Sequence, residues 1–182
     1  MKTAAILILS CLLAAFVAHA EEPKTAAPAA TAKHDASSII INGQIAPAFT
    51  LVTLDGKTVG PAELKGKVVL LNFFATWCGP CMAEMPHLEK EIWPKFKDAN
   101  FILISVGREH NASELKAFRD KKHFTFPIAP DPKREVYGMF AKQYIPRNYV
   151  IDTTGKVAYQ STGFSNDISG LKEAIERALG NK

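Results

Sequence analysis

The chain has 182 residues, of which 47% are hydrophobic, 9% aromatic and 22% charged. This length predicts one domain, and the ordinary globular composition excludes a disordered, collagen-like or multi-span membrane protein. The 22 Lys and Arg residues exceed the 18 Asp and Glu residues by only four, and they occur singly or in short pairs. We therefore expect no nucleic-acid partner, because nucleic-acid-binding domains gather basic residues into a stripe or patch.

The N-terminus has the pattern of a secretory signal peptide. A basic residue, Lys2, precedes an apolar run over 4–18, and a small-residue cleavage site ends at Ala20. The run is shorter than the ~20 apolar residues of a membrane-spanning helix. We therefore expect 1–20 to be a cleaved signal peptide and the protein to be periplasmic or otherwise extracytoplasmic. An uncleaved N-terminal membrane anchor and a lipoprotein attached through Cys11 are the alternatives.

The next segment, 21–38, is rich in Ala, Pro, Thr and Ser and contains no aromatic residue. It lacks the apolar period of a packed helix or strand, so the sequence predicts a flexible linker. The folded domain is expected over 39–182.

Within this domain, predicted strands alternate with predicted helices. Pro86 is expected to kink the first long helix, and Pro94 to strain or end it. The alternation, closed by a hairpin and a helix, predicts an α/β domain with a mixed β-sheet. In chain order we expect a β-hairpin around Asp55-Gly56, a buried strand over 68–74, a helix from Pro80 carrying Met85, Leu88, Ile92 and Phe96, a strand over 101–106, a helix opened by Asn111 and Glu114, a strand over 125–129, a helix opened by Asp131-Pro132, a hairpin of 147–152 and 156–160, and a helix ending at Gly180.

The sharpest chemical signal is the pair Cys78 and Cys81, which lies in a strand-to-helix turn. The spacing lets the two sulfurs form a disulfide. Cys78 is expected at the helix N-terminus, where unpaired N–H groups and the helix dipole stabilise a thiolate and lower the pKa of the thiol. Cys81, one turn further, is expected to be more buried and less acidic. Cys78 is therefore the predicted nucleophile and Cys81 the predicted resolving residue.

Two other uses of the pair remain open. A structural disulfide is one, although Gly79 and Pro80 between the cysteines at a helix start do not favour it. A metal site is the other, but one Cys-x-x-Cys pair supplies only two ligands, so His87 or His110 would have to join it. We predict no metal site.

The segment 72–81, NFFATWCGPC, resembles the active site of thioredoxins. The wider chain, over about 39–180, resembles the bacterial extracytoplasmic thiol–disulfide oxidoreductases of the TlpA/ResA type. This resemblance implies a thioredoxin-like fold with an N-terminal β-hairpin extension, a redox-active disulfide between Cys78 and Cys81, and no cofactor. The other matching segments are Ala46-Pro47-Ala48-Phe49, Asp55-Gly56, Leu64-Lys65-Gly66-Lys67, Glu84-Met85-Pro86, Tyr144-Ile145-Pro146 and Val150-Ile151-Asp152.

The resemblance also implies a substrate-binding set. Pro146 matches a proline that is held in cis opposite the two cysteines, which leaves the backbone of Ile145 free to pair with a bound peptide. Trp77 is expected to shield the disulfide and to offer a flat docking surface. Gly79 and Pro80 complete the set.

Glu84 matches a glutamate three residues after the second cysteine in ResA-like proteins. At this spacing it can lie beside Cys81 on the helix and accept the Cys81 proton when that thiol resolves the intermediate. An exposed glutamate favoured by the helix dipole is the alternative. Arg147 departs from the small or polar residue common after the proline, so it either adds positive potential near the site or lies at the surface. His110 follows a strand end and could line a cleft.

The dipeptide between the cysteines is that of thioredoxin and carries no cationic or donor side chain. Thioredoxin and the oxidant DsbA differ by roughly 150 mV, so we predict a reductant. Family likeness implies a membrane electron donor of the DsbD/CcdA kind and substrates among exported disulfide-containing proteins, including apocytochrome c. A peroxiredoxin-like peroxidase is the runner-up, although Leu71 and Ala75 replace the Pro and Thr of the peroxiredoxin motif. A metal-binding chaperone is the third class.

Overall fold

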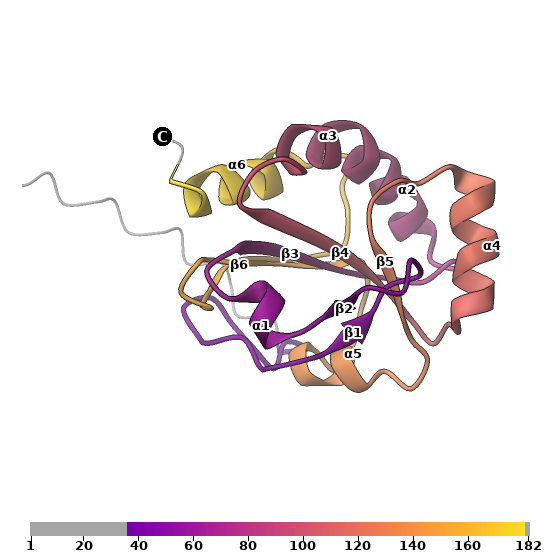
Figure 1. Cartoon of the computed structure of the whole chain (residues 1–182), viewed down its shortest axis with the longest axis horizontal. Coiled ribbons are helices and arrows are strands. Elements are labelled where there is room, and N and C mark those ends of the chain that lie inside the picture. Colours follow the sequence, from indigo (N-terminus) through magenta and orange to yellow (C-terminus); the bar gives the residue numbers. More distant parts are fainter. Residues whose placement is uncertain (1–35, 181–182) are drawn as a thin grey trace, which may run out of the picture. The chain divides into compact units, whose positions relative to one another are not determined.

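The computed structural model of the protein describes residues 36–180 (Figure 1). The predicted signal peptide, 1–20, and most of the predicted linker, 21–38, lie outside these residues, so both assignments stay predictions. Among the described residues, no helix combines the length and the apolar character that crossing a membrane requires.

A five-stranded mixed sheet forms the centre of the domain (Figure 1). The middle strand, β3 (Val68–Phe74), pairs in parallel with β4 (Phe101–Arg108) and antiparallel with β6 (Arg147–Ile151). The outer strands are β5 (Ile128–Asp131), parallel to β4, and β7 (Val157–Thr162), antiparallel to β6. The strand order is β5-β4-β3-β6-β7. The predicted mixed sheet is confirmed.

Helices on one face form a long run beside the sheet (Figure 1). The run consists of α2 (Gly79–His87), a π-helical segment η1 (Leu88–Ile92) and α3 (Trp93–Phe96). It shares one hydrophobic core with α6 (Ser169–Ala178) and α4 (Ala112–Lys122). The run begins where β3 ends, so the first turn of α2 lies at the carboxyl end of the central strand.

The other face carries α5 (Glu135–Phe140) and α1 (Pro61–Leu64), together with the small N-terminal sheet (Figure 1). That sheet pairs β1 (Leu51–Val52) with β2 (Thr58–Val59) in an antiparallel hairpin. Gly56, with φ 77°, supplies the left-handed turn residue that only glycine adopts without strain. The predicted hairpin extension is therefore present.

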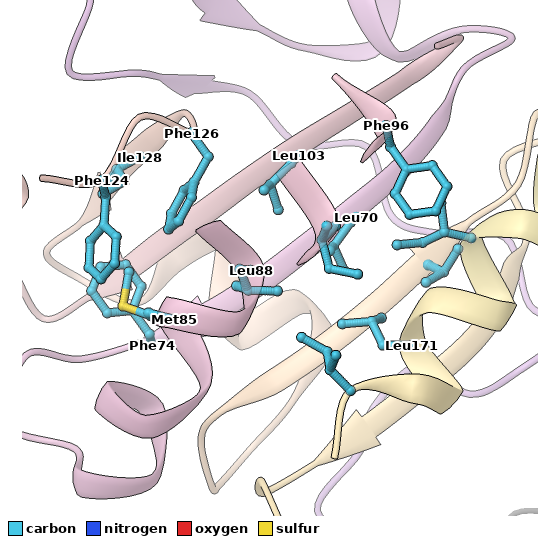
Figure 2. Packing of buried hydrophobic residues seen from close by; sticks show 14 of the residues in the cluster. Leu70, Phe74, Met85, Leu88, Phe96, Leu103, Phe124, Phe126, Ile128 and Leu171 are labelled. Carbon is cyan, nitrogen blue, oxygen red and sulfur yellow. The ribbon is translucent and has the colours of Figure 1, made fainter. Parts of the chain in front are cut away.

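Every residue of β3 is buried because both faces of the sheet are covered. Its side chains alternate between the two cores, so that Leu70 and Phe74 lie in one core and Leu71 and Phe73 in the other. Figure 2 shows the first of these cores, where Leu70 and Phe74 lie among side chains from the long helical run. Burial of each such side chain contributes about 1.5–3 kcal/mol, which fixes the strand that leads into the cysteines.

Two prolines shape the long helical run. Pro86 lies inside α2 and has no N–H to donate, so it removes one hydrogen bond from the helix, but α2 continues to His87. Beyond it, the N–H of Leu88 still donates to the carbonyl of Glu84, four residues back. The run widens only in η1, where the N–H of Trp93 donates to the carbonyl of Leu88, five residues back. Pro94 lies in the first turn of α3, directly after η1. The π-helical turn therefore lies between the two prolines, and the helical run continues past Pro94 to Phe96.

The start of α5 differs from the prediction. Asp131 and Pro132 were expected to open this helix directly, but α5 begins three residues after Pro132. Asp131 still caps the helix at a distance, because its carboxylate accepts the backbone N–H groups of Val136 at 3.4 Å and Tyr137 at 2.8 Å. The strand expected over 125–129 is β5, which begins and ends later in the chain.

The domain also begins earlier than residue 39. Ser37 and Ser38, at the end of the predicted linker, are buried, and Ser38 forms a β-bridge with Ala141. The backbone N–H of Lys142 donates to the carbonyl of Ser37 at 2.8 Å. The last residues of the predicted linker are thus packed onto the segment that follows α5.

Candidate active site

The two cysteines lie where β3 turns into α2, and they form a disulfide. Cys78 is the N-cap residue of α2, and its Sγ accepts the backbone N–H of Cys81 at 3.2 Å. Cys78 is 6% exposed, whereas Cys81 is fully buried. Only Cys78 can therefore meet a partner, and in the reduced protein the free N–H groups of the first helical turn would stabilise its thiolate.

The segment that carries Ile145 and Pro146 lies against the disulfide. The carbonyl oxygen of Ile145 is 3.7 Å from Cys78 Sγ, and the Ile145–Pro146 peptide bond is cis, as the resemblance implied. Pro146 is buried and Ile145 is half-buried. The structure thus brings the predicted Ile145–Pro146 pair beside the predicted nucleophile.

Exposed side chains surround the nearly buried sulfur of Cys78. Trp77 is 61% exposed, and Gly79 and Pro80 are also exposed. Tyr144, the residue before Ile145, is 62% exposed. The three residues predicted from the cysteine turn are therefore accessible next to Cys78, and Tyr144 is an exposed aromatic residue next to Ile145 that was not predicted as part of the site.

Glu84 is buried beneath the cysteine turn, so the alternative of an exposed glutamate is wrong. Its side chain is 2% exposed, and burial raises its pKa to about 7. Hydrogen bonds from Asn148, at 2.7 Å, and Asn72, at 2.9 Å, oppose this rise, as does the nearby His87. A carboxylate with a pKa near neutrality can both accept and release a proton at physiological pH.

A row of polar side chains crosses the sheet below Glu84. Asn72 lies opposite Ser105 on β4 and Asn148 on β6, and Asn148 lies opposite Ser161 on β7. Ser105 donates to Asn72 at 3.0 Å, Asn72 donates to Asn148 at 2.8 Å, and Asn148 donates to Ser161 at 3.3 Å. This row was not predicted from the sequence, although the single Asn inside the apolar run VVLLNFF is a usable signal for it.

His110 lies directly beside the cysteine turn. Its Nε2 accepts the backbone N–H of Thr76 at 3.0 Å, which places the proton of the neutral ring on Nδ1, 3.4 Å from Glu114. The side chain is buried and lines an open groove of about 380 Å³, which answers the question that the sequence left open. The groove is lined by Thr76, His110, Glu114, Ala117, Phe118 and Lys121.

The two histidines considered as metal ligands lie in different settings. His87 pairs with Glu91 at 2.6 Å, and His110 contacts Thr76. Among residues 36–180, no group of three or more His, Cys, Asp or Glu side chains is arranged to hold a metal ion.

Arg147 lies neither at the surface nor on the rim of the site. It is fully buried, and it donates through Nε to the carbonyl of Gln143 at 2.9 Å and through Nη1 to Ser38 Oγ at 2.7 Å. Its Nη2 contacts Ser37 Oγ. The expectation of a surface position was therefore wrong, because the guanidinium is buried among partners from 37–38 and from the preceding loop. Its effect on the electrostatic potential at the site stays a prediction.

The fold and the site together define a thioredoxin-like protein: a mixed sheet between two helical layers, with a Cys-x-x-Cys disulfide at the start of the helix after the central strand. Residues 42–160 match the AhpC/TSA family, and the chain belongs to this family.

Three similar proteins define the class more narrowly. The thiol–disulfide oxidoreductase ResA of Bacillus anthracis is 36% identical over 121 residues, covering 66% of this chain and 69% of the relative. The thioredoxin-like protein YneN of Bacillus subtilis is 37% identical, covering 65% of this chain and 69% of the relative. A crystal structure of a thiol:disulfide interchange protein from Chlorobium tepidum has a TM-score of 0.66 and 28% identity, covering 75% of this chain and 97% of that one. The protein is thus an enzyme, a thiol–disulfide oxidoreductase of the ResA type.

Proposed function

We propose that the protein reduces disulfide bonds in exported proteins, outside the cytoplasm, by dithiol–disulfide exchange through Cys78 and Cys81. The observation that carries this proposal is the layered arrangement of the site. A nearly buried Cys78 lies at a helix N-terminus, a buried Cys81 lies next to it, and the buried carboxyl group of Glu84, three residues further along the same helix, has a pKa of about 7.

The exchange proceeds in two steps. The thiolate of reduced Cys78 attacks one sulfur of the substrate disulfide, whose S–S bond breaks, and the leaving thiolate takes up a proton. Cys81 then loses its proton to Glu84, and its thiolate attacks Cys78 Sγ and releases the second substrate sulfur as a thiolate, which is protonated in turn. Two electrons pass to the substrate, and the enzyme is left with the Cys78–Cys81 disulfide that the structure contains.

A dithiol donor must reduce this disulfide before the next turnover. We propose a membrane electron donor of the DsbD/CcdA kind in this role, and apocytochrome c among the substrates. The predicted signal peptide supports the location, and N-terminal sequencing of the protein from a periplasmic fraction tests it. The expected first residue is Glu21, whereas recovery of Met1 in the membrane fraction would favour the uncleaved anchor.

Trapping in cells tests the activity and names the partners. A Cys81→Ser protein should accumulate mixed disulfides with exported proteins through Cys78, and a Cys78→Ser protein should not. Equal trapping by the two variants would contradict the roles assigned to the cysteines. A redox titration tests the direction of electron flow, because a potential above about −150 mV, near that of DsbA, excludes a reductant. Rapid consumption of hydrogen peroxide by the pure enzyme would favour the peroxidase alternative.

A further inference from the structure

Loop 141–146 joins α5 to β6 and carries Ile145 to the disulfide without regular secondary structure. Three consecutive carbonyl groups of this loop are each held by one side chain. The Ile145 carbonyl, next in line, faces Cys78 Sγ at 3.7 Å. The three hydrogen bonds run from Arg134 to Lys142 at 3.0 Å, from Arg147 to Gln143 at 2.9 Å and from Tyr137 to Tyr144 at 2.9 Å.

Of these three donors, Arg147 also connects the loop to the N-terminal segment. While its Nε holds the Gln143 carbonyl, Nη1 donates to Ser38 Oγ at 2.7 Å and Nη2 contacts Ser37 Oγ. The same segment contacts the loop directly, because Ser37 accepts the Lys142 N–H at 2.8 Å. The guanidinium therefore lies between two chain segments that are more than 100 residues apart.

A guanidinium is suited to this position because it is planar and its donors have fixed relative directions. When Nη1 and Nη2 are held by the two serine hydroxyls, the direction of Nε is set, and with it the position of the Gln143 carbonyl. The loop itself has few internal hydrogen bonds to hold it, so its position depends on such side-chain contacts. Arg147 is fully buried, so solvent does not compete for these bonds.

We propose that Arg147 is a positioning residue that uses Ser37 and Ser38 to hold loop 141–146 in place, and so presents the Ile145 backbone to an extended peptide next to Cys78. This inference rests on the proposed disulfide exchange. It gives the N-terminal segment a part in the site, and it concerns substrates that are polypeptides. A small disulfide meets only the Cys78 sulfur and does not need the Ile145 backbone.

Two changes in the full-length chain test this role. Arg147→Met removes the guanidinium, and the double change Ser37→Ala with Ser38→Ala removes the two hydroxyls and leaves Arg147 in place. Arg147→Lys retains the charge and loses the planar fork. Arg177→Met, at an exposed position of α6, is the matched control. Each reduced protein is mixed in a stopped-flow instrument with insulin, a polypeptide that contains disulfide bonds. In a separate experiment it is mixed with bis(hydroxyethyl) disulfide, a small-molecule disulfide.

We expect the rate constant with insulin to fall about tenfold in Arg147→Met and in the double serine variant, the effect of losing about one charge-assisted hydrogen bond. The rate constant with the small disulfide should not change, and Arg147→Lys should recover part of the insulin rate. Equal losses with both disulfides, or no loss with either, would overturn the proposal. If Arg147→Met does not fold, the double serine variant decides alone. Failure of the unchanged protein to reduce either disulfide would instead refute the proposed function.

Discussion

Replacing Glu84 by Gln tests whether the buried carboxyl group has the pKa that its surroundings imply. In the folded protein this pKa is raised from 4.5 to about 7, chiefly by burial. At pH values between 4.5 and about 7, the folded state therefore keeps a proton on Glu84 that the unfolded state has lost. Stability from this group is fully present below pH 4.5 and is lost as the pH rises through 7. Gln does not titrate, so the variant lacks this loss.

The size of the effect follows from the two pKa values. The difference between 4.5 and about 7 corresponds to roughly 3 kcal/mol, because each pKa unit is worth about 1.4 kcal/mol. Of this, about 2 kcal/mol develops between about pH 5 and about pH 8. The side chain is 2% exposed, so solvent screening takes little from this figure.

Urea unfolding of the oxidised protein at several pH values measures the effect. The disulfide-bonded cysteines do not titrate in this state. The contributions of the other titrating groups largely cancel in the difference between the free energies of unfolding of the two proteins. Between about pH 5 and about pH 8, the free energy of unfolding should fall by about 2 kcal/mol more in the unchanged protein than in Glu84→Gln. The mutation also changes one hydrogen bond to an asparagine, which moves the whole curve but not its slope. If the free energy of unfolding depends on pH in the same way in both proteins, the pKa of Glu84 is not raised, and its role as proton acceptor is refuted with it.

Three further predictions concern the surroundings of the site. Asn148→Ala removes the strongest hydrogen bond to the Glu84 carboxylate, a bond that lowers the pKa of this group, so the midpoint of the pH–rate profile for insulin reduction should rise by about one pH unit. An unchanged midpoint would show that the row of polar side chains does not affect the proton transfer. His110→Phe leaves a backbone N–H of the cysteine turn without its acceptor and should lower the free energy of unfolding by about 1–3 kcal/mol in urea; no loss would mean that another group accepts it. Gly107→Ala would place a methyl group 2.6 Å from Leu115 and should cost about 1–3 kcal/mol by the same measurement, whereas a neutral result would show that α4 can shift.

The cysteine site was predictable because its signals are local. An apolar run, a turn with two cysteines and a helix with Pro80 in its first turn follow one another within 72–81, and each has its own physical signature. The position of Pro146 came from the resemblance alone. The burial of Glu84 was left open, because a helix position does not reveal which element covers it.

The rest depends on pairing between distant segments. The polar row below Glu84 exists only because β6 pairs antiparallel with β3 in a register that brings Asn148 opposite Asn72. Similarly, a charged residue such as Arg147 is normally expected near solvent, and its serine partners lie in a segment whose composition predicts a linker. The start of α5 was misplaced because Asp131 caps it across an intervening turn.

The π-helical turn after Pro86 has a consequence for comparing this chain with its relatives. Such a turn holds one more residue than the α-helical turn that it replaces. A relative whose helix runs on without this turn therefore reaches the position of Trp93 with one residue fewer after its second cysteine. An alignment of such a relative with this chain should open a single-residue gap within 88–92, and an ungapped alignment would match every later helix position with the wrong partner.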